Sequence, residues 1–136
     1  MIDVLIIEDD HDTALLCAMQ MEHVLGERLN TRLAASLGAS LEVLNSGFDP
    51  DLVTLDLNLP DATGVESIAR LRSRLPDTYL LIMSGYDSDK IMADCISRGA
   101  NGYVRKGSGL GVIAKQIQQW RENRCSLQDK TDRLRT

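Results

Sequence analysis

Five short runs of apolar residues recur along this chain, and each is followed by a segment in which apolar residues repeat with helical spacing. Runs of this kind predict strands that are buried on both faces, as in a parallel sheet. The predicted strands span residues 2–7, 30–36, 51–55, 78–84 and 101–105. Because strands and helices alternate, we expect an α/β fold with a parallel sheet, right-handed crossovers and helices on both faces.

The intervening segments predict five helices, which span residues 12–25, 37–47, 64–75, 88–98 and 108 to about 122. Each should turn an apolar stripe towards the sheet. The stripe of the first helix consists of Ala14, Ala18, Met21 and Leu25, with Leu15 and Met19 beside it. The fourth helix carries Ile91, Cys95 and Ile96, and the last carries Leu110, Ile113, Ile117 and Trp120. The arginines of the third helix, Arg70, Arg72 and Arg74, should lie largely outside.

Polar residues near the predicted helix starts are candidates for N-caps. Asp10 or Asp12 can cap the first helix, and Ser108 can cap the last. Asp61 and Thr63 lie just before Gly64, so they suit the start of the third helix better than Asp56 does. This leaves Asp56 for another role.

Length and composition bound the class of protein. The chain has 136 residues, enough for one domain with a hydrophobic core. We expect residues 1–122 to form that domain and residues 123–136 to form a C-terminal helix extension or a frayed tail. The net charge of −5 argues against direct nucleic-acid binding. No apolar run is long enough to cross a membrane and no signal peptide is visible, so no membrane contact is expected.

Three widely spaced cysteines, Cys17, Cys95 and Cys125, form neither a metal motif nor a disulfide framework. Their number and spacing favour buried, reduced thiols in a cytoplasmic protein.

The third predicted strand ends on Asp56, and a turn with Pro60 and Gly64 follows it. A buried carboxylate is costly unless a neighbouring group compensates its charge. For five strands the common doubly wound order, flavodoxin-like, is 2-1-3-4-5, with every strand exit at the same edge of the sheet. We therefore expect the residues at the strand exits to converge there, namely Glu8, Asp9, Asp56, Ser84 and Lys106.

Three carboxylates in one pocket repel one another, and a hard cation such as Mg²⁺ relieves that repulsion. Asp56 could then act as a nucleophile that forms an acyl phosphate. Lys106 would supply positive charge and Ser84 a hydrogen bond to the phosphoryl oxygens. Taken singly, each residue has a plain alternative as a helix-start acid, a turn serine or a surface lysine. Together, at the exits of predicted strands, they indicate one site.

Four motifs carry a resemblance to a known family. They are the pair Glu8-Asp9, the run from Leu55 to Pro60 with Gly64, the pair Ser84-Gly85, and the segment from Gly99 to Lys106. With these motifs the chain resembles the chemotaxis-regulator-like receiver domain of response regulators in two-component signalling. The resemblance runs from residue 2 to about residue 122.

The resemblance implies a role for each site residue. Those that handle the phosphoryl group are Asp56 as phosphoacceptor, Lys106 as the phosphate-sensing lysine and Ser84 as the switch hydroxyl. Tyr103 is the aromatic switch. The implied cofactor is Mg²⁺, with Mn²⁺ as a substitute, bound by Glu8, Asp9, Asp56 and the backbone carbonyl of Asn58. Asp9 is implied to be a direct ligand.

By the same resemblance, the protein is not an enzyme but a phosphoacceptor that assists its own phosphorylation and dephosphorylation. Its donor is a sensor histidine kinase or a histidine phosphotransfer protein. Phosphorylation changes the face made by the fourth helix, fifth strand and fifth helix, roughly residues 88–120, which binds a partner, an output domain or a second copy.

Two features depart from the commonest family pattern. Lys106-Gly107 stands where many members have Lys-Pro, and the segment before Lys106 is closer to NarL-type than to OmpR-type regulators. No DNA-binding domain follows, so we expect either a stand-alone receiver or a piece of a longer regulator or hybrid kinase.

Three other interpretations compete. A haloacid-dehalogenase-like phosphatase also uses a strand-end aspartate and Mg²⁺, but Asn58 stands where its second, acid-base aspartate would be. A flavodoxin would need a Ser/Thr/Gly-rich phosphate loop after the first strand, which this sequence lacks. A pseudo-receiver that works by protein contact alone is a third alternative, against which Asp56 and Lys106 argue.

Overall fold

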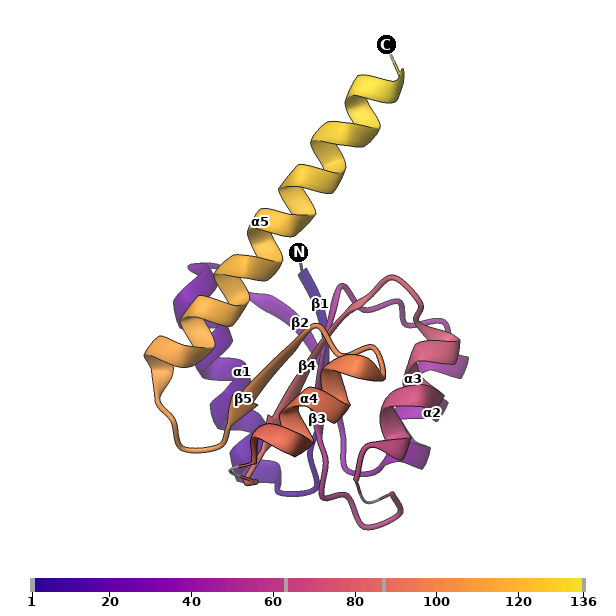
Figure 1. Ribbon diagram of the computed structural model, residues 1–136, viewed down its shortest axis with the longest axis vertical. Helices are drawn as coiled ribbons and strands as arrows, with labels where there is room; N and C mark the ends of the chain where they lie inside the picture. Colours follow the sequence, from indigo (N-terminus) through magenta and orange to yellow (C-terminus); the bar gives the residue numbers. More distant parts are fainter. Residues whose placement is uncertain (1, 63, 87, 136) are drawn as a thin grey trace.

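A parallel sheet of five strands forms the centre of the protein (Figure 1). The computed structural model describes the backbone of residues 2–62, 64–86 and 88–135, and the side chains of these ranges as far as residue 122. The strands are β1 (Ile2–Ile7), β2 (Leu29–Ala34), β3 (Leu52–Asp56), β4 (Tyr79–Ser84) and β5 (Gly102–Arg105). Their order is β2-β1-β3-β4-β5 and all neighbouring pairs are parallel, so the predicted topology is confirmed.

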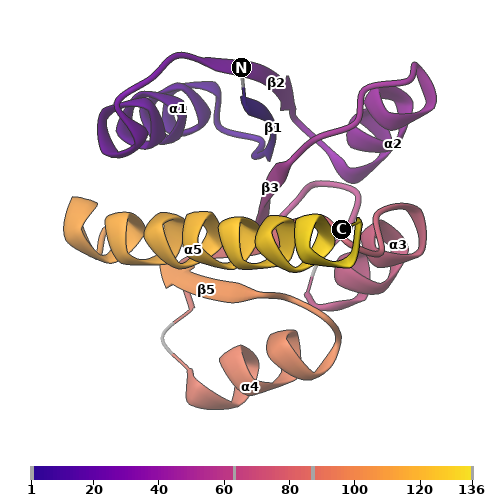
Figure 2. The same cartoon turned by 90° about the horizontal axis from the view of Figure 1, so that it is seen from above.

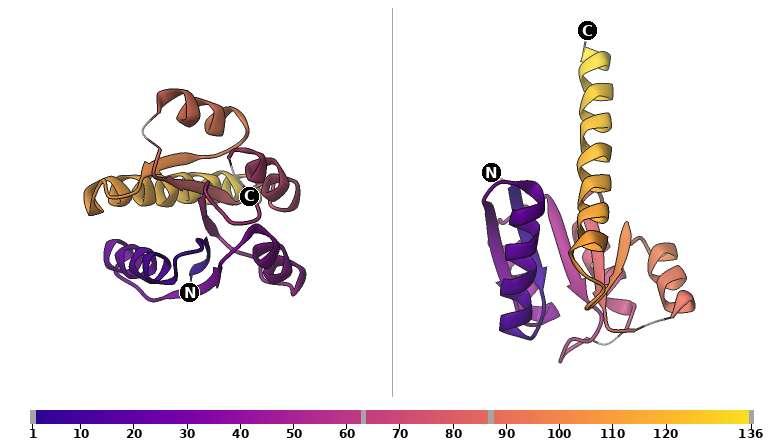
Figure 3. Two further views of the ribbon diagram at one scale, coloured as in Figure 1. Left: turned by 90° about the horizontal axis from the view of Figure 1, so that it is seen from below. Right: turned by 90° about the vertical axis from the view of Figure 1, so that its left-hand side faces the viewer.

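Helices cover both faces of the sheet. They are α1 (His11–Leu25), α2 (Leu37–Asn45), α3 (Glu66–Arg74), α4 (Asp89–Ser97) and α5 (Leu110–Arg135). Helices α1 and α5 pack on one face, and α2, α3 and α4 on the other (Figures 2 and 3). Helix α5 continues well beyond the end of the sheet (Figure 1). Among the described residues, no helix combines the length and apolar character needed to span a membrane.

The apolar strand sequences follow from this layering. Successive side chains of a strand point to opposite faces, so both sets must be apolar when helices cover both faces. In β1, Leu5 and Ile7 join the core under α2 and α3, whereas Val4 and Ile6 join the core under α1 and α5. All residues of β3, including its terminal Asp56, are buried.

Four apolar residues expected on or beside helix stripes are partly exposed. In α1, Leu15 and Met19 are 43% and 66% exposed, whereas Cys17 is buried in the core. The helical period of 3.6 residues explains this, because residues 14, 17, 21 and 25 already complete one face. Leu110, at the start of α5, is 37% exposed, and Ile96 of α4 is also exposed.

The start of α1 agrees with prediction, whereas the start of α3 differs from it. Helix α1 is capped by Asp10, one of the two expected candidates, whose side chain accepts from the Asp12 N–H. Helix α3 begins later than expected, and its N-cap residue Val65 makes no capping hydrogen bond through its side chain. Asp61 does not cap α3 but binds the first turn of α2. Thr63, the other candidate, lies outside the described residues.

The Ser108 hydroxyl donates to the Arg105 carbonyl at 2.6 Å and so closes a turn before α5. This contact is not the predicted cap, because a capping side chain accepts hydrogen bonds from N–H groups of the helix, whereas here the Ser108 hydroxyl donates.

Arg72 was expected on the outer side of α3, but it is half-buried and binds several acceptors. Its Nε donates to the Gly99 carbonyl at 2.7 Å, and Nη1 donates to the carbonyls of Leu75 and Thr78. Nη2 donates to the Asn101 side chain. Burial lowers the pKa of Arg72, although the guanidinium remains charged. One side chain therefore ties the end of α3 to the turns before β4 and β5.

We expect Arg72→Ala to lower the free energy of unfolding by about 2 kcal/mol, because several half-buried carbonyls lose a charged donor. Arg72→Lys should lower the free energy of unfolding by a smaller amount, since one ammonium cannot make all the hydrogen bonds of the planar guanidinium. Urea unfolding measures both. The exposed Arg70 of the same helix provides the control, and Arg70→Ala should change stability by less than about 0.5 kcal/mol. Equal losses from the two alanine variants would contradict this assignment.

Candidate functional site

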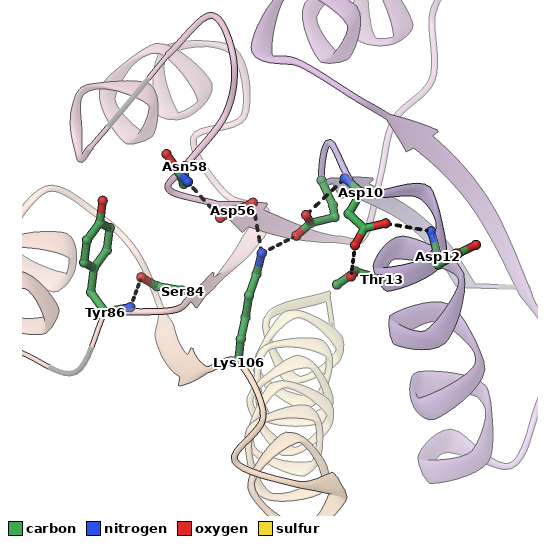
Figure 4. Close-up of polar contacts among 9 residues, drawn as sticks. Asp10, Asp12, Thr13, Asp56, Asn58, Ser84, Tyr86 and Lys106 are labelled. Atoms are coloured by element: carbon green, nitrogen blue, oxygen red, sulfur yellow. Dashed lines mark hydrogen bonds and ion pairs between the residues drawn. The ribbon is translucent and has the colours of Figure 1, made fainter.

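The expected site residues lie together at the carboxyl edge of the sheet (Figure 4). Glu8 follows β1, Asp56 ends β3, Ser84 ends β4 and Lys106 follows β5. The register explains the convergence, because Ile7 pairs with Leu55 and Ser84 pairs with Arg105. Parallel pairing thus brings these side chains to the same level of the sheet.

Three carboxylates offer ligand atoms within 4.8 Å of one another, those of Glu8, Asp9 and Asp56. Glu8 is 7% exposed and Asp56 3% exposed, whereas Asp9 is open to solvent. An oxygen-only set of this kind fits a hard cation such as Mg²⁺, which keeps several waters and takes few protein ligands. The donor chemistry therefore agrees with the cofactor implied by the sequence.

Asp10, the third acid of the run, is turned towards α1 and not towards this set (Figure 4). Its Oδ2 accepts from the Thr13 hydroxyl at 2.8 Å, and that hydrogen bond lowers the pKa of the Asp10 carboxyl. Asp10 is therefore the N-cap of α1, which agrees with the alternative role of an acidic residue at a helix start.

Lys106 joins the two buried carboxylates. Its Nζ lies 2.7 Å from Glu8 Oε2 and 3.0 Å from Asp56 Oδ2. Burial lowers the pKa of Lys106, but the hydrogen bonds and charges of Glu8 and Asp56 outweigh it, so the pKa is raised overall. Burial raises the pKa of Glu8, although hydrogen bonds from Lys106 and the Asp10 N–H oppose the rise.

The two oxygens of Asp56 have different partners. Oδ2 accepts from Lys106, and Oδ1 accepts from the Asn58 N–H at 3.0 Å. These bonds hold the carboxylate in one orientation at the end of β3. The carboxylate is thus oriented in advance, as nucleophilic catalysis requires.

A cavity of about 30 Å³ lies beside Asp56 and Glu8, large enough for roughly one water molecule. Thr13, Cys17 and Met83 are among its lining residues, and no sequence motif indicates that they lie near the site. Burial raises the pKa of the Cys17 thiol to about 11, so it stays protonated at neutral pH. Cys17 therefore does not compete with Asp56 as a nucleophile.

Ser84 and Tyr103 are linked through Tyr86. The Ser84 side chain is buried, and its Oγ accepts from the Tyr86 N–H at 3.0 Å (Figure 4). The Tyr103 hydroxyl donates to the Tyr86 carbonyl at 2.9 Å. Both bonds use the backbone of Tyr86, so the type of side chain at this position does not reveal the link.

Comparison with known proteins agrees with the fold. The family model of the response regulator receiver domain matches residues 4–118. The chain is 49% identical over 81 residues to the DNA-binding transcriptional activator DevR/DosR of Mycobacterium tuberculosis, covering 60% of this chain and 37% of that protein. It is 32% identical over 96 residues to the nitrate/nitrite response regulator protein NarL of Escherichia coli, covering 71% and 41%. The chain thus spans well under half of each of these relatives.

Solved structures share the fold. One is a response regulator protein from Burkholderia pseudomallei with a phosphorylated aspartic acid, a calcium ion and citrate. The match has a TM-score of 0.73 at 25% identity and covers 93% of this chain and 72% of the other.

We expect Lys106→Met to lower the free energy of unfolding by about 2 kcal/mol at neutral pH in metal-free buffer. Its loss leaves two buried carboxylates facing each other; a fully buried pair would lose about 3–5 kcal/mol, but the Lys106 side chain is 31% exposed. Urea unfolding of the variant and wild type gives the difference.

The deficit should shrink as the pH falls from about 7 to about 5. Without the ammonium, the pKa of Glu8 rises further above its unfolded value, so the folded state binds more protons and gains stability on acidification. A second substitution, Glu8→Gln, should recover part of the loss by removing one of the facing charges. A deficit that is the same at both pH values would rule out carboxylate repulsion as its cause.

Proposed function

Because this chain belongs to the response regulator receiver domain family, we propose that Asp56 accepts a phosphoryl group from a sensor histidine kinase or a histidine phosphotransfer protein. The observation that carries the proposal is the setting of Asp56. Its oxygens are oriented by Lys106 and by the Asn58 N–H, and Glu8 and Asp9 offer further ligand atoms within 4.8 Å. An aspartate with only a structural role would not need a lysine and two further carboxylates beside it.

Glu8, Asp9, Asp56 and the backbone carbonyl of Asn58 would hold Mg²⁺, or Mn²⁺ in its place. When bound, the cation neutralises charge on the phosphoryl oxygens. The proposed Asn58 ligand is consistent with its N–H bond to Asp56, which keeps the two residues adjacent.

In the transfer, an Asp56 oxygen forms a bond to phosphorus, and the bond between phosphorus and the donor histidine nitrogen breaks. The electron pair of that bond returns to the imidazole. Lys106 exchanges part of its contact with Asp56 for a phosphoryl oxygen and so stabilises the transferred group. The Ser84 hydroxyl donates to another phosphoryl oxygen. The protein acts as the acceptor and assists the later hydrolysis, and it is not a multiple-turnover enzyme.

Ser84 and Tyr103 carry the conformational change from the phosphorylated Asp56 to the protein surface. When Ser84 donates to the phosphoryl group, its contact with the Tyr86 N–H changes, and Tyr86 also binds the Tyr103 hydroxyl. The side chain of Tyr103, a residue of β5, then moves into the space that Ser84 vacates. The face formed by α4, β5 and α5 changes its affinity for a partner or a second copy, by shifting a population that already exists.

The output is proposed to be control of a partner or an output domain. DevR/DosR is named as a DNA-binding transcriptional activator, and it aligns with this chain over only 37% of its length. The receiver itself, with its net charge of −5, is not expected to contact nucleic acid.

We expect Asp56→Asn to abolish phosphorylation by acetyl phosphate, because the amide keeps the shape but is no nucleophile. Intact-protein mass spectrometry should show a single phosphoryl adduct on wild type only when Mg²⁺ is present. Sustained hydrolysis of phosphate esters, with no adduct, would support the phosphatase alternative. A phosphoryl adduct on Asp56→Asn as abundant as on wild type would move the acceptor elsewhere.

We expect Ser84→Ala to take up phosphate but to lose most of the change in partner or dimer affinity, because Asp56 and Lys106 remain while the switch hydroxyl is gone. Sedimentation with and without a beryllofluoride mimic measures this response. Ser73→Ala, an exposed serine on α3, is the matched control and should respond like wild type. An undiminished response in Ser84→Ala would remove Ser84 from the switch.

A further inference from the structure

Asp61 connects the loop after β3 to a helix far away in the sequence. Its Oδ1 accepts from the Leu37 N–H at 2.9 Å, and its Oδ2 accepts from the Gly38 N–H at 2.8 Å. Both donors belong to the first turn of α2, where N–H groups have no partner within the helix. Ser36, the N-cap of α2, already binds the Ala39 N–H at 3.0 Å. The start of α2 is thus held by one local side chain and one distant one.

Glycine at position 38 permits this approach. A Cβ there would lie 3.3 Å from Asp61 Oδ2, tighter than most van der Waals contacts. The exposed carboxylate keeps its charge readily, because the hydrogen bonds from Gly38 and Leu37 lower the pKa of Asp61.

Two hydrogen bonds between described residues close the loop that carries Asp61 on itself. The Gly64 N–H donates to the Leu57 carbonyl at 2.9 Å, and the Leu59 N–H donates to the Ala62 carbonyl at 3.3 Å. Leu57 and Leu59 are anchored in the core under α2 and α3. These apolar contacts hold the loop against the core. Because apolar contacts are not directional, hydrogen bonds to a neighbouring element are needed to stop the loop from sliding along the core surface.

Asn58 lies between the two anchored leucines and is exposed to solvent. Its N–H binds Asp56 Oδ1, so the position of the loop is transmitted directly to the carboxylate.

We propose that Asp61 is a positioning residue of the phosphorylation site, which holds Asn58 against Asp56 by fastening the loop from Leu57 to Gly64 onto the start of α2. The inference rests on the proposed function for its link to Mg²⁺ binding, since Asn58 is proposed to supply a ligand. Its structural part, the placement of the Asn58 backbone, is independent of the metal.

The test compares wild type with Asp61→Ala, Asp61→Asn and Ser36→Ala, all ¹⁵N-labelled and all at a temperature where each is folded. Ser36→Ala is the matched control, because it removes a capping bond from the same helix turn and leaves the β3–α3 loop untouched. Asp9→Asn serves as the reference for lost Mg²⁺ binding. The readouts are the Asn58 amide shift without metal, hydrogen exchange of the Leu37 and Gly38 amides, and the Mg²⁺ dissociation constant.

Asp61→Ala should shift the Asn58 amide resonance, speed exchange at Leu37 and Gly38, and weaken Mg²⁺ binding about tenfold, the lower end of losses seen for outer-shell partners of metal ligands. Asp61→Asn keeps one acceptor oxygen and should lie between Asp61→Ala and wild type. Ser36→Ala should lower the melting temperature while its Asn58 shift and Mg²⁺ affinity stay as in wild type.

The outcomes separate the two ideas. If wild type binds Mg²⁺ and Asp61→Ala binds it as tightly, with an unmoved Asn58 amide, the positioning role is overturned and the proposed function stands. If wild type binds no Mg²⁺, the proposed function fails, and the Asn58 shift alone then decides whether Asp61 positions the loop. Equal effects of Ser36→Ala and Asp61→Ala on Mg²⁺ affinity would also overturn the role, by assigning the effect to the stability of α2.

Discussion

The ammonium of Lys106 between Glu8 and Asp56 is the interaction on which the site depends. The two carboxylate side chains are only 6% and 4% exposed, and charges so deeply buried are costly unless a partner compensates them. Lys106 meets both within 3.0 Å, while its own side chain remains 31% exposed. The charge balance is therefore held by a flexible group that water can still reach. Such a group can keep its charge while changing one of its partners.

The sheet order makes this contact possible. β1 and β3 are neighbours, so Glu8 and Asp56 leave the sheet side by side. β4 lies between β3 and β5, and Lys106 has to reach across it. The long stem of a lysine can span that distance, whereas a shorter cationic group could not. Ser84 ends β4, so its buried hydroxyl lies between the strand that ends on Asp56 and the strand that carries Tyr103.

The two ends of α4 are held very differently. After its C-terminal end, the Gly99 carbonyl and the Asn101 side chain both bind the Arg72 guanidinium. Asn101 Oδ1 also accepts from the Leu80 N–H of β4, so this end is joined to the sheet by several bonds. Before its N-terminal end, the segment beyond Ser84 is linked through the backbone of Tyr86 to Ser84 and Tyr103. One end is therefore anchored to α3 and the sheet, and the other is linked to Ser84 at the candidate site.

The sequence by itself determined the α/β class, the strand order and the residues at the strand exits. The reason is that apolar runs, turn residues and strand-end carboxylates are local signals, and a parallel sheet has few allowed topologies. The strand order is confirmed by the structure, and membership of the receiver family by the family match.

Only the tertiary structure decided which polar groups meet across the chain. Asp61 seemed suited to the nearest helix but binds the start of α2. Arg72 seemed to be a surface residue but joins the end of α3 to the turns before β4 and β5. The convergence of Glu8 and Lys106 at one edge of the sheet was predicted, but the direct ion pair between them was not. A carboxylate or guanidinium has equal chemical affinity for near and distant partners, so its sequence context does not select among them. Folding makes that selection, because it decides which unpaired donors and acceptors come within reach.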